Sequence, residues 1–317
     1  MELDQLGDIR IIDRTRVRAL LPSLPEQIKI AGDIYRDLAK GNIEMPPKIG
    51  IHPRENSFIH AMPAFLQYQD VATVKLVSGY PANPSKGIPY IHGVIVVFQA
   101  ETGKPVALLD GAEITAARTA AASGACVEAL APVGWSRVAV LGCGEQASYH
   151  ARVLHALNSD VEILAYDPVR SRAETLHPNA QACSTPREAV EAADVVITAG
   201  PIVSDATPVL TVDWLKPECL VLPIDFDFYV TSELVADSKS FAVDDVAQYD
   251  YYRSLGFFQN WAEGKVSTGE LLGSERASGV TTVANLGVGA LDAGFAAAVL
   301  AADDSTSDRW HDLDQRA

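Results

Sequence analysis

Residues 137–147 read RVAVLGCGEQA, an apolar run followed at once by the pattern G-x-G-x-x-A. The run is short and rich in β-branched residues, which is typical of a buried strand, and residues 146–157 have the pattern of a helix. Gly142 permits the tight turn between them, and Gly144 lets the backbone come close to a pyrophosphate. The small side chain of Ala147 allows the helix to pack closely on the strand. This stretch predicts a strand–loop–helix unit that binds a dinucleotide.

The start of this helix is suited to an anion. Its first residues, Glu145 and Gln146, present backbone N–H groups together with the positive end of the helix dipole. The next strand is predicted at residues 161–166. Asp167 follows it, about twenty residues beyond the loop, where a carboxylate can accept hydrogen bonds from an adenosine ribose. Because that carboxylate would repel a 2′-phosphate, we expect NAD rather than NADP.

Two alternatives stay open for this motif. Gly-rich turns are common, so a purely structural turn is the competing interpretation. The order of strand, loop, helix, strand and acid favours dinucleotide binding. Arg170 and Arg172 lie close to Asp167 and keep NADP as an alternative cofactor.

The chain falls into two regions that differ in pattern. From about residue 133, strands alternate with tight turns and helices, which is typical of a parallel sheet with crossover helices. Further strands are predicted there at residues 194–200, 219–225 and 240–245. The first region has proline-rich connections, strand-like runs at residues 73–79, 93–99 and 103–111, and an alanine-rich helix at 114–130.

These regions predict an α/β protein of two domains, in agreement with its 317 residues. A Rossmann-type dinucleotide-binding domain is expected at residues 131–280. A smaller α+β domain, expected to bind the substrate, would comprise residues 1–130 plus 281–317. Residues 281–301 are predicted to form an Ala- and Gly-rich helix that returns to this smaller domain.

The composition narrows the class of ligand. The chain has 25 Lys and Arg against 41 Asp and Glu, a formal net charge of −16, which argues against nucleic acid and anionic membranes as partners. The first ten residues have no features of a secretory signal, and no run approaches about 18 apolar residues; Asp292 interrupts the most apolar stretch near the end. The four cysteines show no C-x-x-C pair and no metal-ligand spacing. We therefore expect a cytoplasmic protein without a metal.

Three cations in the first region are candidates for binding an anionic substrate. Lys75 lies inside an apolar strand, Arg118 lies in a helix of small residues that would let a ligand approach, and Lys48 lies in a proline-flanked segment. A guanidinium can hold a carboxylate through two parallel hydrogen bonds. Each has a structural alternative: the lysines can extend to solvent, and Arg118 can pair with Glu113 or Asp110.

Several motifs together carry a resemblance to a known family. They are TGKPVALLDGAEITAARTAAASGACVEALAP at 102–132, VAVLGCGEQA at 138–147, HAMPA at 60–64, VKLVSGYPAN at 74–83 and IDFDFYVTSEL at 224–234. In these stretches the chain resembles the ornithine cyclodeaminase and mu-crystallin family, which also contains amino-acid dehydrogenases and ketimine reductases. The resemblance extends from Met45 through Leu286.

The resemblance implies roles for individual residues. Arg118, in the R-T-A-A motif, would hold the substrate α-carboxylate, and Thr119 beside it would contact the cofactor. Lys75 would contact the carboxylate or take part in proton transfer. Asp227 would lie over the reacting carbon and nitrogen, with Asp225 as the rival for that role. The alternative for both aspartates is capping of the turn after a strand.

Three positions depart from the family pattern. Lys48 stands where the family usually has an arginine, so it supplies charge without a bidentate fork. Tyr90 stands where the ornithine enzyme has a threonine, and His60 where it has a glutamate. The loss of that acid weakens the case for a substrate with a cationic far end. His60, Tyr90 and His92 would shape the substrate site or, alternatively, pack as ordinary core side chains.

The resemblance implies a NAD-dependent enzyme that acts at the amine-bearing carbon of a small α-amino acid or cyclic imino acid, as a dehydrogenase or imine reductase. One alternative is an ornithine or lysine cyclodeaminase, which uses NAD without net redox change. Another is a non-catalytic, crystallin-like NAD(P)-binding protein. A 2-hydroxy-acid dehydrogenase is disfavoured because His150, His155 and His177 lie in or after the helix behind the loop. The resemblance also implies a homodimer formed through the first domain.

Overall fold

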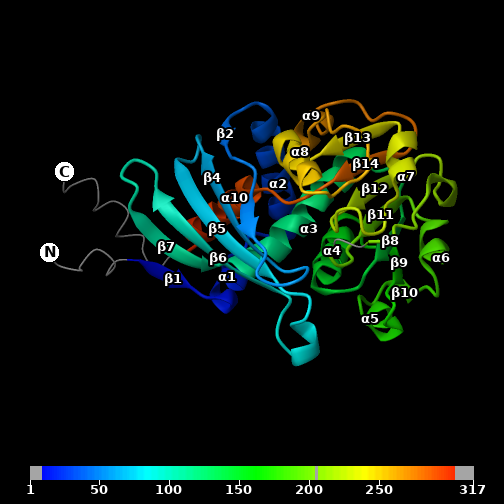
Figure 1. The fold of residues 1–317 in the computed structure, drawn as a ribbon, viewed down its shortest axis with the longest axis horizontal. Helices are drawn as coiled ribbons and strands as arrows, with labels where there is room; N and C mark the ends of the chain where they lie inside the picture. Colours follow the sequence, from blue (N-terminus) through cyan, green and yellow to red (C-terminus); the bar gives the residue numbers. More distant parts are fainter. Residues whose placement is uncertain (1–8, 204–205, 304–317) are drawn as a thin grey trace.

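The computed structural model describes residues 9–203 and 206–303 and contains two seven-stranded sheets with a long helix between them (Figure 1). That helix, α3 (Gly111–Leu130), packs on the first sheet and also on α4 (Glu145–Leu157), the helix that follows the first strand of the second sheet. It is almost entirely buried and consists largely of Ala, Gly and Ser. Small side chains let the elements on both sides approach it closely. Residues on α3 can therefore reach a space shared by the two sheets.

The first sheet has the order β1-β7-β6-β5-β4-β2, with β3 paired to β4. Its pairs are antiparallel except for β1 with β7. The strands are β1 (Arg10–Ile12), β2 (Ile43–Glu44), β3 (Ile49–Ile51), β4 (Phe58–Leu66), β5 (Val71–Gly79), β6 (Ile91–Gln99) and β7 (Pro105–Asp110). A short 3₁₀ turn, η2 (Pro84–Lys86), lies in the connection from β5 to β6.

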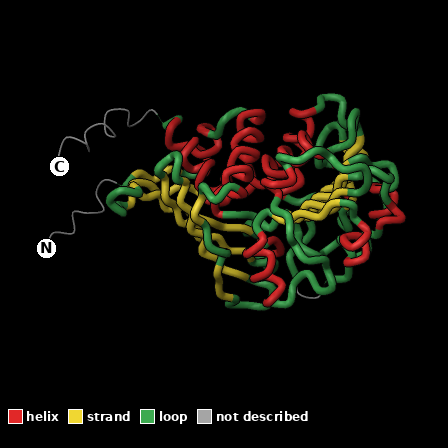
Figure 2. The backbone as a smooth tube through the Cα atoms, turned by 90° about the horizontal axis from the view of Figure 1, so that it is seen from above, coloured by secondary structure: helices red, strands yellow, loops and turns green. Residues whose placement is uncertain are grey.

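One face of the first sheet is covered by helices, as Figure 2 shows. They are α1 (Arg14–Leu20), α2 (Leu24–Ala39), α3 and α10 (Gly289–Ala301). Strand β5 alternates in the expected way: Thr73, Lys75 and Val77 are buried on the covered face, and Val74 and Leu76 point the other way. Lys75 is therefore directed into the protein rather than into solvent.

The second sheet is parallel throughout, in the order β10-β9-β8-β11-β12-β14-β13. Its strands are β8 (Arg137–Leu141), β9 (Glu162–Tyr166), β10 (Ala180–Ala182), β11 (Val195–Thr198), β12 (Leu220–Pro223), β13 (Ser240–Val243) and β14 (Thr281–Ala284). The connecting segments are α4 (Glu145–Leu157), α5 (Arg170–Glu174), α6 (Pro186–Val190), η3 (Val212–Trp214), α7 (Ser232–Asp237), α8 (Val246–Ser254) and α9 (Thr268–Leu271). The first strands have the Rossmann order: β9 and β10 are added on one side of β8, and β11 and β12 on the other. This confirms the expected fold class.

One expectation for the C-terminal part was wrong. Residues 281–301 were predicted to be a single helix, whereas Thr281–Ala284 forms β14 between β12 and β13, and the helix begins at Gly289. The run TTVA is β-branched and fully buried, which suits a central parallel strand. The second sheet thus extends past the expected boundary at residue 280, and the return to the first sheet is made by α10 alone.

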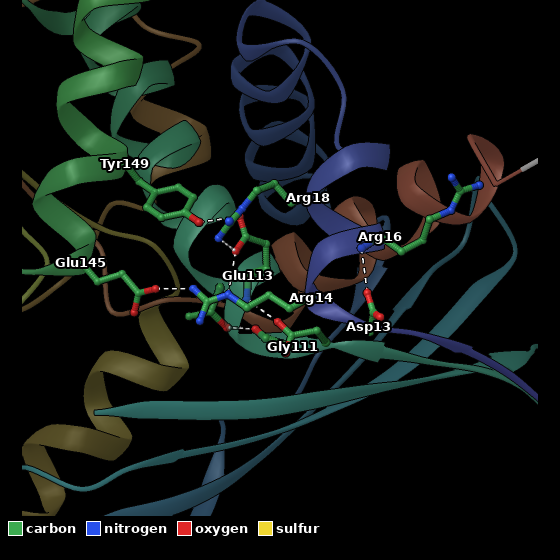
Figure 3. A network of polar contacts seen from close by, with 10 residues as sticks. Asp13, Arg14, Arg16, Arg18, Gly111, Glu113, Glu145 and Tyr149 are labelled. Carbon is green, nitrogen blue, oxygen red and sulfur yellow. Dashed lines mark hydrogen bonds and ion pairs between the residues drawn. The ribbon is translucent and has the colours of Figure 1, made fainter. Parts of the chain in front are cut away.

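A cluster of charged side chains ties α1 to α3 and α4 (Figure 3). Glu113, whose side chain is 1% exposed, accepts hydrogen bonds from Arg14 at 2.9 Å, from Arg18 at 2.7 and 3.0 Å, and from the hydroxyl of Tyr149. Arg14 also pairs with Glu145, the first residue of α4. Burial alone would raise the pKa of Glu113, but the hydrogen bonds from Arg18, Tyr149 and Arg14 outweigh it and lower the pKa to about 2.

The partners proposed as structural alternatives for Arg118 are therefore engaged elsewhere. Glu113 binds Arg14 and Arg18, and Asp110 caps α3 by accepting from the Glu113 N–H at 2.7 Å. Across residues 9–203 and 206–303, no helix combines the length and the apolar character needed to cross a bilayer. The same residues include no cluster of three or more His, Cys, Asp or Glu suited to a metal ion.

Candidate active site

A cavity of about 1220 Å³ lies between the two sheets. One part is formed by the loops that follow β8, β9 and β11, where the order of the second sheet reverses. Ligands of open α/β sheets bind at this point. The other part is formed by β4, β5, α3 and the segment after β12. The predicted site residues that line it are Lys48, His60, Lys75, Tyr90, Arg118, Thr119, Gly142, Gly144, Glu145, Gln146 and Asp167.

The loop after β8 has the geometry that a pyrophosphate needs. Gly142 adopts φ +90°, and a Cβ there would lie 2.5 Å from the carbonyl oxygen of Ala199, so only glycine fits. Gly144 is the N-cap of α4 and offers no side chain to the first N–H groups of the helix. A Cβ on Gly144 would meet nothing within 4 Å, so the space before the helix is open. Ala147 is completely buried behind the loop, which fits its predicted packing role.

Asp167 fixes this loop to the end of β9. Its Oδ2 accepts from the N–H of Cys143 at 2.9 Å and its Oδ1 from the N–H of Val169 at 2.8 Å. Arg172 approaches the same carboxylate at 4.0 Å. Each carboxylate oxygen has more than one lone pair, so these bonds leave capacity for a ribose hydroxyl. The predicted ribose contact stays a prediction, and the loop-holding bonds are an additional role.

The part of the cavity formed by β4, β5 and α3 adjoins a buried ion cluster whose acidic member, Asp292, was not predicted from the sequence. Asp292 on α10 pairs through Oδ2 with Lys75 Nζ at 2.6 Å and through Oδ1 with Arg118 Nε at 3.1 Å. All three side chains are at most 6% exposed. Lys75 also donates to Thr115 Oγ1 at 3.2 Å. The only sequence signal for Asp292 was a lone acid in an apolar run.

Lys48 enters the cavity from the segment before β3. Its Nζ donates to the carbonyl oxygen of Leu286 at 2.6 Å and lies 5.4 Å from the ring centroid of Phe226 and 5.0 Å from that of Tyr252. Burial lowers the pKa of Lys48 to about 8, although the carboxylate of Asp244 acts in the opposite direction. The side chain is therefore a buried cation that can lose its proton near neutral pH.

Lys75 has a pKa that is lowered further. Burial lowers the pKa of Lys75 to about 7, with the positive charge of Arg118 acting in the same direction and the carboxylate of Asp292 in the opposite direction. A lysine of this kind exists in both protonation states near neutral pH. It is thus suited to accept or donate a proton in the cavity.

Asp227 is not brought together with these cations. Its Oδ2 accepts from the N–H of Phe258 at 2.8 Å, and it does not line the cavity. Asp225 is fully buried and accepts from the N–H of Gly200 at 2.7 Å and from the hydroxyl of Thr198. Burial raises the pKa of Asp225 to about 7 and also raises that of Asp227. In this structure both aspartates hold turns, as in the alternative interpretation, and Phe226 between them lines the cavity.

The predicted histidines differ in their surroundings. His60 lines the cavity and stacks on Phe58, with ring centroids 4.4 Å apart. Burial and the charge of Lys48 lower its pKa to about 3, so the imidazole is neutral. His92 is exposed and does not line the cavity. His150 is a buried residue of α4 whose Nε2 lies 2.9 Å from the hydroxyl of Ser123, an ordinary internal contact.

Comparison with known proteins shows which proteins the chain is similar to. The model of the ornithine cyclodeaminase/mu-crystallin family matches residues 10–248. The nodulation efficiency protein NfeD of Rhizobium meliloti is 32% identical over 307 residues, 93% of this chain and 95% of that protein. The alanine dehydrogenase of Archaeoglobus fulgidus is 30% identical over 75% of this chain and 74% of its own length. The solved structure of Thermococcus litoralis Δ1-pyrroline-2-carboxylate reductase, in complex with NADH and L-proline, has a TM-score of 0.81 at 25% identity and covers 93% of this chain and 97% of that one.

Proposed function

The chain belongs to the ornithine cyclodeaminase/mu-crystallin family, and we propose on this premise that it is a NAD-dependent enzyme acting at the amine-bearing carbon of a small α-amino acid or cyclic imino acid. It would act as an amino-acid dehydrogenase or, in reverse, as an imine reductase. The observation that carries the proposal is a single cavity that joins an open phosphate-binding loop to a buried cluster of Lys48, Lys75 and Arg118. A protein that only stored a dinucleotide would need the first feature and not the second.

The residues at the loop fit a dinucleotide. The backbone at Gly142, Gly144, Glu145 and Gln146 would hold the pyrophosphate at the uncapped start of α4. Asp167 would accept hydrogen bonds from the ribose, which favours NAD over NADP. Thr119 would face the cofactor from α3. When bound, NAD supplies a two-electron acceptor for the hydrogen of the substrate's amine-bearing carbon.

The cations would bind and activate the amino acid. Arg118 and Lys48 would hold its α-carboxylate, which fixes the amine-bearing carbon in one place and makes the transfer effectively intramolecular. Lys75 in its neutral form would take the proton from the amine as the C–H bond breaks and its electron pair leaves, so that a C=N bond forms. Water added to that imine gives the 2-oxo acid and ammonia. Asp227 does not line the cavity in this structure, so it would share this role only if its carboxylate turned toward the substrate.

We also propose that two copies of the chain associate through the uncovered face of the first sheet. That face carries apolar side chains from three neighbouring strands, Val74, Leu76, Val94, Val96 and Leu108, which are partly exposed. Figure 2 shows the helices on the other side of the sheet. A contiguous apolar patch of this kind marks an interaction surface. Residues 1–130 with α10 would then form the substrate and dimerisation domain, and the segment from residue 131 through β14 the NAD domain. Four free, buried cysteines suit a cytoplasmic location.

The experiment incubates the protein with NAD and a panel of amino acids, and with NADH and cyclic imino acids. We expect steady release of NADH from at least one amino acid, or consumption of NADH by an imino acid. Release of ammonia without net NADH would identify a cyclodeaminase instead. Neither signal across both panels would overturn the proposal.

A further inference from the structure

One side of the substrate part of the cavity is built from aromatic rings. Phe58 and His60 come from β4, Phe226 follows β12, and Tyr252 and Phe257 come from α8 and the segment after it. The rings contact one another in sequence: Phe58 and His60 are stacked at 4.4 Å, Phe226 lies 5.0 Å from Tyr252 and 5.3 Å from Phe257, and His60 lies 6.3 Å from Tyr252. We refer to these five residues as the aromatic wall.

The aromatic wall adjoins the carboxylate-binding cations. Lys48 Nζ lies 5.4 Å from the ring centroid of Phe226 and 5.0 Å from that of Tyr252, within the range of a cation–π contact. An amino acid whose carboxylate is held by Lys48 and Arg118 therefore has its remaining atoms within a few bonds of the wall. The side chain of the substrate is the part that can reach it.

The charges around the wall disfavour a cationic side chain. Among the described residues, the acidic side chains that line the cavity are Glu145 and Asp167, and both belong to the phosphate-binding loop and the end of β9. Asp292 is already paired with Lys75 and Arg118. The faces of Phe226 and Tyr252 could attract an ammonium group, but Lys48 already occupies them. An ammonium on the substrate would thus be buried next to a like charge without a carboxylate partner.

Two residues that line the cavity have buried hydroxyl groups without partners. The hydroxyl oxygens of Tyr90 and Tyr252 are buried, and neither has a hydrogen-bond partner among the described residues. Tyr252 is 3% exposed as a whole, and both residues line the cavity. An unpaired buried hydroxyl is unfavourable, so a ligand that supplies an uncharged hydrogen-bonding group here would be stabilised.

We infer that the substrate is an α-amino acid, or the corresponding imine, with an uncharged aromatic side chain, and that a phenol is accepted as readily as an unsubstituted ring. This inference rests on the proposed function and deepens it. The aromatic wall supplies the surface for the ring by edge and face contacts, and the hydroxyls of Tyr90 and Tyr252 supply hydrogen bonds for a polar substituent. Small side chains would leave the wall uncovered, a cationic one would lie beside Lys48 without a counter-ion, and an anionic one would compete with the α-carboxylate for Lys48.

The test compares kcat/KM for phenylalanine, tyrosine, alanine, aspartate, ornithine and lysine with saturating NAD. Phenylalanine and tyrosine should exceed the other four by at least about tenfold, the discrimination that an apolar pocket provides. NADH release with alanine, aspartate, ornithine or lysine equal to or faster than with the aromatic pair would overturn the inference and leave the proposed function intact. NADH release from none of them, without NADH use on imines, would overturn both.

Variants of the wall test the same idea within one protein. His60→Glu places a carboxylate in the wall and should raise the ratio of kcat/KM for ornithine over phenylalanine by at least about tenfold. Val133→Glu adds the same charge at a fully exposed position and should leave that ratio unchanged. Tyr252→Phe keeps the ring and should lower kcat/KM for tyrosine relative to phenylalanine. An unchanged ratio in both His60→Glu and Tyr252→Phe would contradict the assignment.

A direct binding measurement covers the case in which His60→Glu does not fold. Calorimetric titration of the wild-type protein, saturated with NADH, should show tighter binding of phenylalanine and tyrosine than of ornithine and lysine. Equal or tighter binding of the diamino acids would overturn the inference without reference to any variant.

Discussion

At the scale of single residues, Asp292 changes the charge balance of the site. Three cations, Lys48, Lys75 and Arg118, converge there, and Asp292 pairs with two of them. When Lys75 is neutral, the charge of Arg118 is balanced by Asp292 and one net positive charge, on Lys48, remains for one substrate carboxylate. Asp292 is thus a positioning residue that orients Arg118 and sets the proton affinity of Lys75.

The pH dependence of amine oxidation should report Lys75 and Lys48. Burial lowers the pKa of Lys75 to about 7 and that of Lys48 to about 8. In the proposed mechanism the neutral form of Lys75 would accept the proton, so kcat/KM should rise as the pH increases through about 7. It should fall above about 8, where Lys48 loses the charge that binds the carboxylate. A profile that is flat from pH 6 to 9 would contradict these assignments.

Asp292→Asn should shift that profile in a defined direction. The carboxylate of Asp292 raises the pKa of Lys75, so its removal lowers that pKa further. The rising limb of kcat/KM should therefore move to lower pH. Overall activity should decrease as well, because Arg118 loses the ion pair that orients it. A variant whose rising limb stays in place would show that Lys75 is not the group being titrated.

Arg118→Ala should separate substrate binding from cofactor binding. Loss of hydrogen bonds to a carboxylate should raise KM for the amino acid by about 10- to 100-fold. The affinity for NADH, measured by fluorescence titration, should change by less than about threefold because α4 and its loop are untouched. Arg118→Lys keeps the positive charge but cannot form two parallel hydrogen bonds, so its KM should lie between those of the wild type and Arg118→Ala. An unchanged KM would remove Arg118 from the substrate site.

The two glycines of the phosphate loop should respond differently to the same substitution. Gly142→Ala introduces a Cβ 2.5 Å from the Ala199 oxygen at φ +90°, so it should lower the thermal midpoint of unfolding. Gly144→Ala meets open space, so it should leave the midpoint nearly unchanged and weaken NADH binding by obstructing the pyrophosphate. Thermal unfolding with and without NADH measures both effects. Normal NADH affinity in Gly144→Ala would contradict the placement of the pyrophosphate.

At the scale of elements, the Glu113 cluster joins α1 to the helix that carries Arg118 and to the helix that begins at the phosphate loop (Figure 3). The helix α1 is far from α3 and α4 in the sequence, and its contacts hold both of these consecutive helices in place. When a buried group of this kind loses a charged partner, the remaining charge is left uncompensated and the folded protein is destabilised.

Glu113→Gln should therefore destabilise the protein by about 1–3 kcal/mol at neutral pH. The pKa of Glu113 is lowered from 4.5 to about 2, so the stability it contributes is fully present above pH 4.5 and is lost as the pH falls toward 2. The free energies of unfolding of wild type and variant should differ at neutral pH and converge in acid. Asp33→Asn, at an exposed ion pair with Lys29, serves as the control and should cost less than about 1 kcal/mol. A constant difference at every pH would contradict this assignment.

Local sequence patterns predicted most elements of the second sheet and the helix α3. The strands β8, β9, β11, β12 and β13 are apolar runs bounded by turn residues, and such signals are local. The strand β14 was missed because its four residues run directly into an Ala- and Gly-rich stretch that has helical character. Pairing with β12 and β13 decides its conformation, and that contact is invisible to a local pattern.

The candidate site, too, was predicted only where its residues lie close together in the sequence. The phosphate loop and the ends of its strand and helix follow from eleven consecutive residues, 137–147. The pairing of Asp292 with Lys75 and Arg118 joins three distant segments, so no local window contains it. The position of Asp227 follows from a motif, but its bond to the N–H of Phe258 depends on how a later loop folds back.

At the scale of the whole molecule, an acidic protein can bind an anionic cofactor and an anionic substrate because neither depends on its net charge of −16. In the proposed function, backbone N–H groups and a helix terminus would face the cofactor, and buried cations would face the substrate. The second sheet, the shared helix α3 and the first sheet together bring these two kinds of anion site into one cavity.

Association through the uncovered face of the first sheet should respond to a charge placed on it. Leu76→Glu inserts a carboxylate at the 43%-exposed centre of that face and should weaken association by burying an unpaired charge. Light scattering should report a mass near twice 33.9 kDa for the wild type and a shift toward 33.9 kDa for the variant. Val133→Glu, outside this face, should behave as the wild type. A monomeric wild type would contradict the proposed dimer.

The central claim is that the C–H bond at the amine-bearing carbon breaks and its hydrogen passes to NAD. It is tested most directly with an amino acid that is turned over, deuterated at that carbon, followed by mass spectrometry of the NADH formed. We expect one deuterium in each NADH and a slower reaction than with the protiated amino acid. Unlabelled NADH would contradict the account.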